Sequence, residues 1–195
     1  MKYNATAMIL AGGGSTRMGQ DKASLPVGED TLLGEKLPWL LAHFNEVLIS
    51  AQDKDHYSDK GLTVVPDEVA DQGPLMGLYS SMAVAQEEWI FLIACDQVNP
   101  PWDLVETLWA GHTQQDAIAP KTERGIEPLF AFYKTSTRPV LRQCLDKGMR
   151  SLHQFLKQVN TRYVDAGGDA FWNINTPEAY KAYLEHRKTH GVVQP

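Results

Sequence analysis

Residues 7–22 read AMILAGGGSTRMGQDK, in which an apolar run leads directly into a glycine-rich loop. The apolar run, Ala7 to Ala11, has no polar side chain, which is typical of a strand covered on both faces of a sheet. The loop contains three consecutive glycines, followed by the cations Arg17 and Lys22. Glycines let backbone N–H groups approach an anion closely, and cations balance its charge. The stretch therefore predicts a strand followed by a loop that binds a polyphosphate.

Two common glycine motifs do not match this loop. With Gly12 as its first glycine, the dinucleotide-binding fingerprint requires a glycine at its sixth position, where this chain has Arg17. The P-loop of NTPases requires lysine and then serine or threonine after its last glycine, but Gln20 and Asp21 follow Gly19. The sequence thus excludes both motifs. A plain glycine turn with two solvated cations is the structural alternative.

The pattern of the first strand recurs along the chain. Short apolar runs alternate with segments in which apolar residues recur at helical spacing. Such alternation predicts an α/β fold with three layers and a mostly parallel central sheet. No internal repeat, low-complexity tract or linker interrupts it, so we expect one domain over residues 1–195. The expected strands cover 7–11, 47–49, 62–65, 89–93, 117–119 and 129–133, and the expected helices cover 75–82, 104–109 and 180–187.

Ligand sites in such sheets lie beyond the carboxyl ends of the strands, which here are the loops after Leu10, Val65 and Ile93. Asp96 follows the last of these strands closely, so the strand would hold its carboxylate rigidly at this edge. One carboxylate, together with waters and substrate phosphates, is sufficient to bind Mg²⁺. A place at the start of the helix near Pro101 is the structural alternative for Asp96.

Composition and charge narrow the range of partners. The chain has 18 basic and 24 acidic side chains, a net charge of −6, which argues against binding nucleic acid or an anionic membrane through bulk electrostatics. Its longest apolar run, Trp89 to Cys95, has seven residues, whereas a membrane span needs about 20. The start lacks the apolar stretch of a secretory signal, and two cysteines cannot form a disulfide framework. We expect a protein of the cytoplasm.

Six short motifs occur in order along nearly the whole chain. The first is the run from Leu10 to Lys22, with the pattern Leu-Ala-Gly-Gly, a variable stretch, Arg-Met-Gly and Asp-Lys. The others are VPD at 65–67, GPLMG at 73–77, ACD at 94–96, EPLF at 127–130 and NINTPE at 173–178. Together they resemble the nucleotidyltransferases related to molybdenum cofactor guanylyltransferase. The resemblance implies a three-layer, Rossmann-like (GT-A-like) fold and an enzyme that transfers GMP from GTP to the terminal phosphate of molybdopterin, releasing pyrophosphate.

The resemblance also assigns roles to single residues. It implies that Asp96 binds Mg²⁺, that Lys22 neutralises phosphate charge and that Arg17 neutralises the leaving pyrophosphate, which makes these three residues catalytic. A surface role is the structural alternative for each cation. Asp67 would accept hydrogen bonds from a guanine edge or a ribose hydroxyl, although an aspartate also starts turns. The implied GTP contacts are Leu10, Ala11, Gly12, Gly13, Lys22, Ser50, Asp67, Gly77 and Asp96.

Asn173 and Asn175 belong to the last motif, which the resemblance places on the molybdopterin side of the active site. Their neutral amides suit a place where metal, phosphate and pterin groups meet, because they add no negative charge. A purely structural role in the turn before Pro177 is the alternative. The resemblance further implies transient contacts with the proteins that deliver molybdopterin and mature molybdoenzymes.

Ser50 departs from the family pattern, which commonly has asparagine after the second strand. A hydroxyl lacks the paired donor and acceptor of an amide, so this residue puts guanine selectivity in question. The Gly-Gly pair of the first motif favours guanine over cytosine, because molybdopterin cytidylyltransferases usually have Ala-Gly there. Another enzyme of the same superfamily, or a non-catalytic carrier of nucleotide or molybdopterin, is a further alternative. The presence of Arg17, Lys22 and Asp96 together argues against a carrier.

Overall fold

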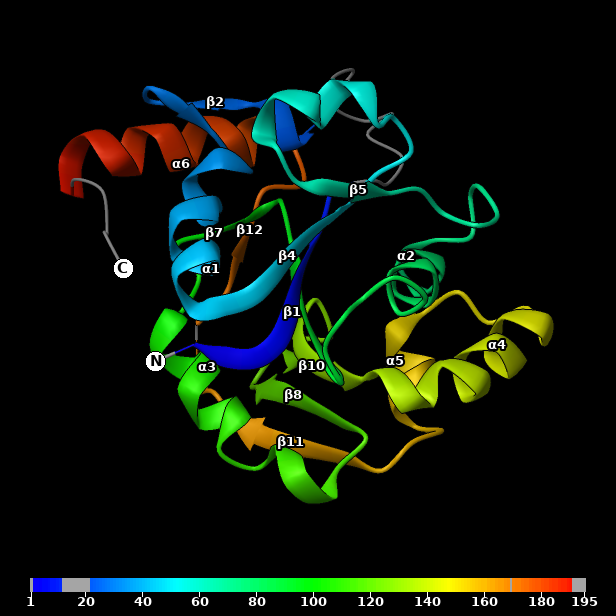
Figure 1. Cartoon of the computed structure of the whole chain (residues 1–195). Helices are drawn as coiled ribbons and strands as arrows, with labels where there is room; N and C mark the ends of the chain where they lie inside the picture. The colour runs from blue at the N-terminus through cyan, green and yellow to red at the C-terminus, as the bar shows by residue number, and fades with distance from the viewer. Residues whose placement is uncertain (1, 12–21, 169, 191–195) are drawn as a thin grey trace.

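A twisted sheet crosses the centre of the protein, and helices cover both of its faces in the computed structural model (Figure 1). The structure describes residues 2–11, 22–168 and 170–190. Within these residues the sheet has eight strands in the order β11-β8-β10-β6-β1-β4-β5, with β9 paired to β8. They are β1 (Tyr3–Leu10), β4 (Phe44–Ser50), β5 (Thr63–Val65), β6 (Trp89–Ala94), β8 (Ala117–Thr122), β9 (Gly125–Ile126), β10 (Phe130–Lys134) and β11 (Thr161–Asp165).

Parallel and antiparallel pairings occur in this one sheet. β1 is parallel to β4 and β6, β4 is parallel to β5, and β11 is parallel to β8, whereas β10 is antiparallel to β6 and β8. The predicted mostly parallel, three-layer α/β fold is confirmed, and a strand is present at each expected position. The sequence pattern misses β11, because in this edge strand only Val164 is buried and no continuous apolar run marks it.

Two apolar cores, one on each face of the sheet, hold the layers together. Side chains alternate along β1, so Ala7 and Ile9 belong to the first core and Met8 belongs to the second. Helices α1 and α3 cover the first core, and α2, α4 and α5 cover the second (Figure 1). Their bounds are α1 (Leu37–His43), α2 (Pro74–Ser81), α3 (Trp102–Trp109), α4 (Arg138–Asp146) and α5 (Leu152–Leu156). None of the described helices is long and apolar enough to cross a membrane.

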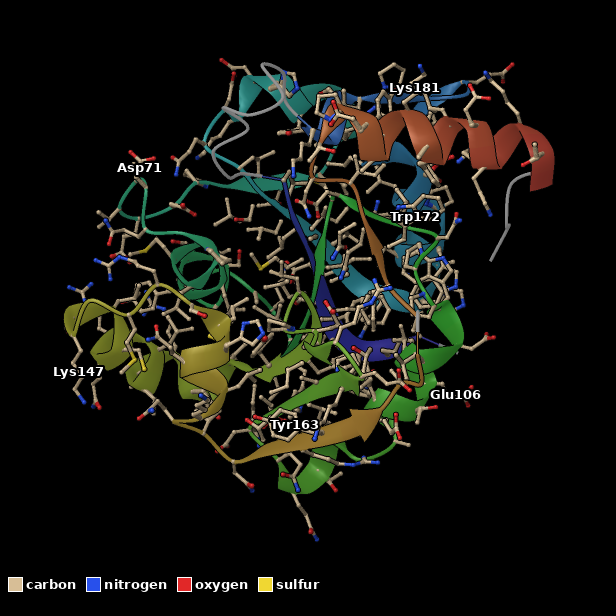
Figure 2. All side chains as sticks on the ribbon, turned by 180° about the vertical axis from the view of Figure 1, so that it is seen from behind. Asp71, Glu106, Lys147, Tyr163, Trp172 and Lys181 are labelled. Carbon is tan, nitrogen blue, oxygen red and sulfur yellow. The ribbon has the colours of Figure 1, made fainter. Side chains whose placement is uncertain are left out.

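A third, smaller core lies under α6 (Pro177–His190). Trp172 lies below this helix and packs edge-on against Tyr183, with 5.5 Å between the ring centroids (Figure 2). Two short antiparallel ladders, β2 with β3 and β7 with β12, lie in the same region. Because β7 follows β6 directly, its pairing with β12 places the segment before α6 beside the end of β6. These strands are β2 (Pro26–Val27), β3 (Asp30–Thr31), β7 (Gln97–Val98) and β12 (Trp172–Asn173).

The parallel register aligns the carboxyl ends of the central strands. Leu10 pairs with Ser50 on one side and with Ala94 on the other, and Ser50 pairs with Val65. Each of these residues is the last of its strand. The following loops therefore start from one edge of the sheet, which is where the sequence predicts the ligand site.

A buried hydrogen bond fixes the loop that leads into β10. The Tyr133 hydroxyl, which has no exposed surface, donates to the Pro128 carbonyl over 2.7 Å. Burial raises the pKa of Tyr133 well above its usual value, so the hydroxyl keeps its proton. Leu129 of the same loop accepts a hydrogen bond from the backbone N–H of Ala94, at 3.1 Å. The bond of Tyr133 thus supports the segment beside the end of β6.

We expect the Tyr133→Phe variant to lose about 1–3 kcal/mol of unfolding free energy, because the buried Pro128 carbonyl loses its donor. Urea unfolding measures this loss. Tyr163→Phe is the matched control, since Tyr163 lies on the edge strand β11, is 40% exposed and should tolerate the same change (Figure 2). Equal stabilities of the two variants would contradict the prediction.

Candidate active site

Three side chains from separate segments meet at the carboxyl edge of the sheet. Lys22 Nζ donates to Asp96 Oδ2 and to Asn175 Oδ1, at 2.9 Å in each case. Lys22 begins the short helix η2 (Lys22–Ser24), Asp96 lies between β6 and β7, and Asn175 lies in the turn before α6. The side chains of Lys22 and Asp96 are each 18% exposed, so solvent and ligands reach the pair. The structure thus joins three residues that the sequence predicts from widely separated motifs.

Three hydrogen bonds from different directions hold the backbone around Asp96. The N–H of Cys95 donates to the Leu10 carbonyl over 3.1 Å, and the N–H of Ile174 donates to the Asp96 carbonyl over 2.9 Å. The Lys36 ammonium donates to the Cys95 carbonyl over 2.8 Å. Because these bonds anchor the chain to β1, β12 and the segment before α1, the carboxylate of Asp96 has a defined position.

A second group of predicted residues surrounds Gly77 in α2. A methyl group at Gly77 would lie 2.7 Å from Ser50 Oγ, 3.0 Å from Leu10 Cδ1 and 3.5 Å from Asp67 Oδ1. The first of these distances is too short for a real Cβ contact, so the close approach requires glycine. Leu10, Ser50, Asp67 and Gly77 therefore converge on one small space, which we call the Gly77 group.

The carboxylate of Asp67 lies half-buried after β5. Burial raises the pKa of this carboxyl above its usual value, while a hydrogen bond with the side chain of Gln52 acts in the opposite direction. The Ser80 hydroxyl accepts a hydrogen bond from the backbone N–H of Glu68 over 2.9 Å, which ties the loop to α2. When ionised, Asp67 is an acceptor for the N–H or O–H groups of a ligand.

Leu10 and Ala11 connect the two groups. The N–H of Ala11 donates to the Ser50 carbonyl over 3.0 Å, and Leu10 accepts the bond from Cys95 on its other side. The Gly77 group and the Lys22–Asp96–Asn175 contact therefore flank the end of the same strand. In this arrangement the Gly77 group can bind a base and a sugar, and the adjacent Lys22–Asp96 pair can bind phosphate groups, directly or through a metal ion. Arg17, Gly12 and Gly13 lie outside the described residues.

Three carboxamide atoms beside Asp96 are buried without hydrogen-bond partners among the described residues. They are both polar atoms of the Gln97 side chain and Oδ1 of Asn173, whose residues lie opposite one another in the β7–β12 ladder. Asn175, rather than Asn173, contacts Lys22. Sequence reasoning misses Gln97, although its position directly after Asp96 is a signal that could have found it. Unpaired buried amides destabilise a fold, so their presence here is typical of a functional region.

The Asp96 carboxylate fits a magnesium ligand. Its Oδ2 atom contacts Lys22, and no group of three or more His, Cys, Asp or Glu side chains occurs within the part of the chain that is described. One carboxylate matches the preference of Mg²⁺ for few protein ligands, several waters and substrate phosphates. The alternative role for Asp96 at a helix start is wrong, because α3 begins only at Trp102 and has Asp103 in its first turn.

The chain is similar to known proteins over nearly its whole length. Residues 7–161 match the MobA-like NTP transferase domain family. A molybdenum cofactor guanylyltransferase of Yersinia pseudotuberculosis is 34% identical over 193 residues, which cover 96% of this chain and 99% of the relative.

Solved structures show the same fold. Molybdopterin-guanine dinucleotide biosynthesis protein A from Archaeoglobus fulgidus has a TM-score of 0.79 and 20% identity, with 94% of this chain and 99% of that chain covered. A Mycobacterium tuberculosis protein in complex with manganese has a TM-score of 0.72 and 19% identity, with 93% and 98% covered. The family match over residues 7–161 contains Lys22, Asp96 and the Gly77 group, whereas Asn173 and Asn175 lie beyond it. The chain is therefore a nucleotidyltransferase and belongs to the MobA-like NTP transferase family.

Proposed function

We propose that this enzyme transfers GMP from GTP to the terminal phosphate of molybdopterin. An oxygen of that phosphate attacks the α-phosphorus of GTP, and the bond from this phosphorus to the oxygen that bridges to the β-phosphate breaks. Pyrophosphate leaves with that oxygen, and the product is a guanine dinucleotide form of molybdopterin. The observation that carries the proposal is the Lys22–Asp96–Asn175 contact beside the Gly77 group. The name of the Yersinia pseudotuberculosis relative supports the choice of substrates.

The reaction brings two anions together, so alignment and charge neutralisation supply most of the catalysis. Lys22 provides a cation at the edge of the sheet, and its bonds to Asp96 and Asn175 fix the direction of the ammonium group. Arg17, from the same motif, is proposed to neutralise the leaving pyrophosphate. No covalent intermediate with the enzyme is needed, because a phosphate oxygen of the acceptor is itself the nucleophile.

Asp96 is the residue that would hold Mg²⁺. When bound, the ion would neutralise charge on the triphosphate. The chain contributes a carboxylate at the end of the fully buried strand β6, held by the bonds of Cys95 and Ile174. The manganese complex of the Mycobacterium tuberculosis protein supports a divalent cation in this fold.

The Gly77 group is proposed to bind the guanosine part of GTP. The two oxygens of the Asp67 carboxylate can accept hydrogen bonds from N1–H and the 2-amino group, the donors that distinguish guanine. The Ser50 hydroxyl lies beside Gly77 and replaces the asparagine that is common in the family. The proposed backbone contacts of the nucleotide are Leu10, Ala11, Gly12 and Gly13.

The acceptor is proposed to bind on the other side of Asp96, at Asn173 and Asn175. The unpaired Oδ1 of Asn173 supports a ligand here, because a bound pterin could supply the missing donor. The proposal includes one functional domain over residues 1–195 that acts in the cytoplasm. It also includes transient contacts with the proteins that deliver molybdopterin and receive the product.

Nucleotide selectivity can be measured by thermal unfolding with GTP, CTP, ATP or UTP, each with and without Mg²⁺. GTP at about a hundredfold excess over its Kd should stabilise the fold by about 2.7 kcal/mol, and the other nucleotides should stabilise it less. A larger effect of CTP would keep the fold and the chemistry but overturn the guanine assignment. No effect of any nucleotide would contradict GTP binding to the free enzyme.

The Gly77→Ala variant should bind GTP at least about tenfold more weakly, because its methyl group would displace Ser50 and fill the space beside Asp67. The double variant Gly77→Ala/Ser50→Gly should recover part of the affinity, since it removes the clashing hydroxyl. Isothermal titration calorimetry measures both. Gly168→Ala is the control, because no atom lies within 4 Å of the added methyl group. Equal losses in the single and double variants would show that the contact with Ser50 is not the cause.

The Asp96→Asn variant should keep its fold and lose at least about a hundredfold in turnover, because a neutral amide binds a metal ion more weakly than a carboxylate and carries no charge to balance Lys22. Pyrophosphate release under saturating substrates measures the loss, and circular dichroism checks the fold. Glu123→Gln is the control, as this exposed side chain lies in the turn between β8 and β9. Turnover near that of the wild type would remove Asp96 from the metal site.

A further inference from the structure

Lys36 is the only charged side chain among the buried residues of the described chain, with 3% of its surface exposed. It ends the short helix η3 (Gly34–Lys36), directly before α1. No carboxylate within the described residues lies within ion-pair distance of its ammonium group, and its neighbour Glu35 pairs with Arg187 of α6 instead. Burying an ammonium without an ion pair is costly, so its position needs a physical explanation.

The ammonium of Lys36 lies behind the turn that carries Asp96. Its Nζ donates to the carbonyl of Leu32 and to the carbonyl of Cys95, at 2.8 Å in each case. The Cys95 carbonyl belongs to the peptide group that joins Cys95 to Asp96. One hydrogen bond and one peptide group therefore connect the ammonium to Asp96, the candidate metal ligand, and the ammonium itself is buried in the protein interior.

Two cations thus lie near Asp96, one at its carboxylate and one at the preceding carbonyl group. Lys22 contacts the carboxylate from the side that solvent reaches, whereas Lys36 holds the backbone from the interior. Burial lowers the pKa of Lys36 to about 8, and electrostatic interactions with Cys95, Glu35 and Asp96 limit this decrease. The group is therefore mostly protonated at neutral pH.

A neutral donor could make the same two hydrogen bonds without the cost of burying a charge. An amide or hydroxyl would serve equally well if the only task were to tie η3 to the end of β6. A positive charge adds a long-range effect, because charges in a protein interior act over several ångströms with little screening. The choice of lysine is explained if the ligands at this edge are anions.

We infer that Lys36 is a positioning residue of the active site, an internal cation that holds the turn before Asp96 and favours the polyphosphate at the adjacent edge. The inference rests on the proposed function for the identity of the anion. Lys36 touches neither substrate. It acts through the backbone at Cys95 and through its positive potential, which attracts the triphosphate and opposes overly tight binding of the metal.

The charge can be separated from the hydrogen bonds with two variants. Lys36→Met removes the charge and the donor, and Lys36→Gln removes the charge but keeps a donor. The affinity of each variant for pyrophosphate is measured by titration in the presence of EDTA. Its affinity for Mn²⁺ is measured in a separate titration that is monitored by electron paramagnetic resonance. We expect each variant to bind pyrophosphate about three- to tenfold more weakly and Mn²⁺ more tightly by a similar factor. The reason is that the positive charge of Lys36 attracts the anion and repels the cation.

Opposite shifts are the result that a merely structural role would not produce. Weaker binding of both ligands would mean that the turn has loosened, and wild-type affinities in Lys36→Gln would mean that only the hydrogen bonds matter. Either result overturns the inference. Leu40→Ala is the control. Leu40 is a fully buried residue of α1, so this substitution should lower the unfolding free energy while leaving both affinities unchanged.

The experiment also distinguishes this inference from the proposed function. Pyrophosphate tests the role of the charge whatever base the enzyme prefers, so a wild type that binds pyrophosphate and Mn²⁺ but not GTP would reject only the guanine assignment. A wild type that binds neither pyrophosphate nor Mn²⁺ would overturn both. Turnover should fall about tenfold in Lys36→Gln with the KM for GTP raised as well, because the potential acts on bound substrate and on the transition state.

Discussion

Parallel pairing of β1 with β4 and β6 is the constraint on which the rest of the site depends. It places Leu10 beside Ser50 on one side and beside Ala94 on the other, and every loop of the site starts from these strand ends. A slip of one residue would turn the side chains of β1 to the opposite faces and separate the two cores. Ala7 and Ile9 pack into one core and Met8 packs into the other, which opposes such a slip, so packing of the cores also fixes the geometry of the site.

Charge is arranged locally in a chain that is acidic as a whole. The net charge of −6 repels anions at long range, so a polyphosphate must be attracted at short range. Lys22 and Lys36 approach the turn at Asp96 from the solvent side and from the interior. Under the proposed function, this separation would let the Asp96 carboxylate bind a metal ion without being fully neutralised by either lysine. A buried lysine costs stability, and its place beside the site is consistent with selection for activity rather than for stability.

Some buried polar groups have hydrogen-bond partners, whereas others beside Asp96, and the Ser81 hydroxyl of α2, have none among the described residues. Away from the site, the buried Thr6 hydroxyl donates to Glu46 over 2.6 Å and Tyr133 donates to Pro128, so each has a partner. Beside Asp96, the amides of Gln97 and Asn173 have no such partners within the described residues. Buried polar groups in proteins are generally paired, and the exceptions occur mainly at functional sites. The unpaired side-chain atoms beside Asp96 and the close packing at Gly77 therefore support the proposed positions of the two substrates.

The sequence by itself determined the fold class and the six main strands, because these depend on local patterns of continuous apolar runs and helical spacing. From short motifs at strand ends it also predicted most of the residues that the structure brings together at the carboxyl edge of the sheet. It could not reveal the edge strand β11, which lacks an apolar run, or the importance of Gln97 and Lys36. Lys36 lies in a segment without any motif, and its bond to Cys95 spans 59 positions. Such contacts depend on how the sheet register and the helix layers pack together, so only the tertiary structure decided them.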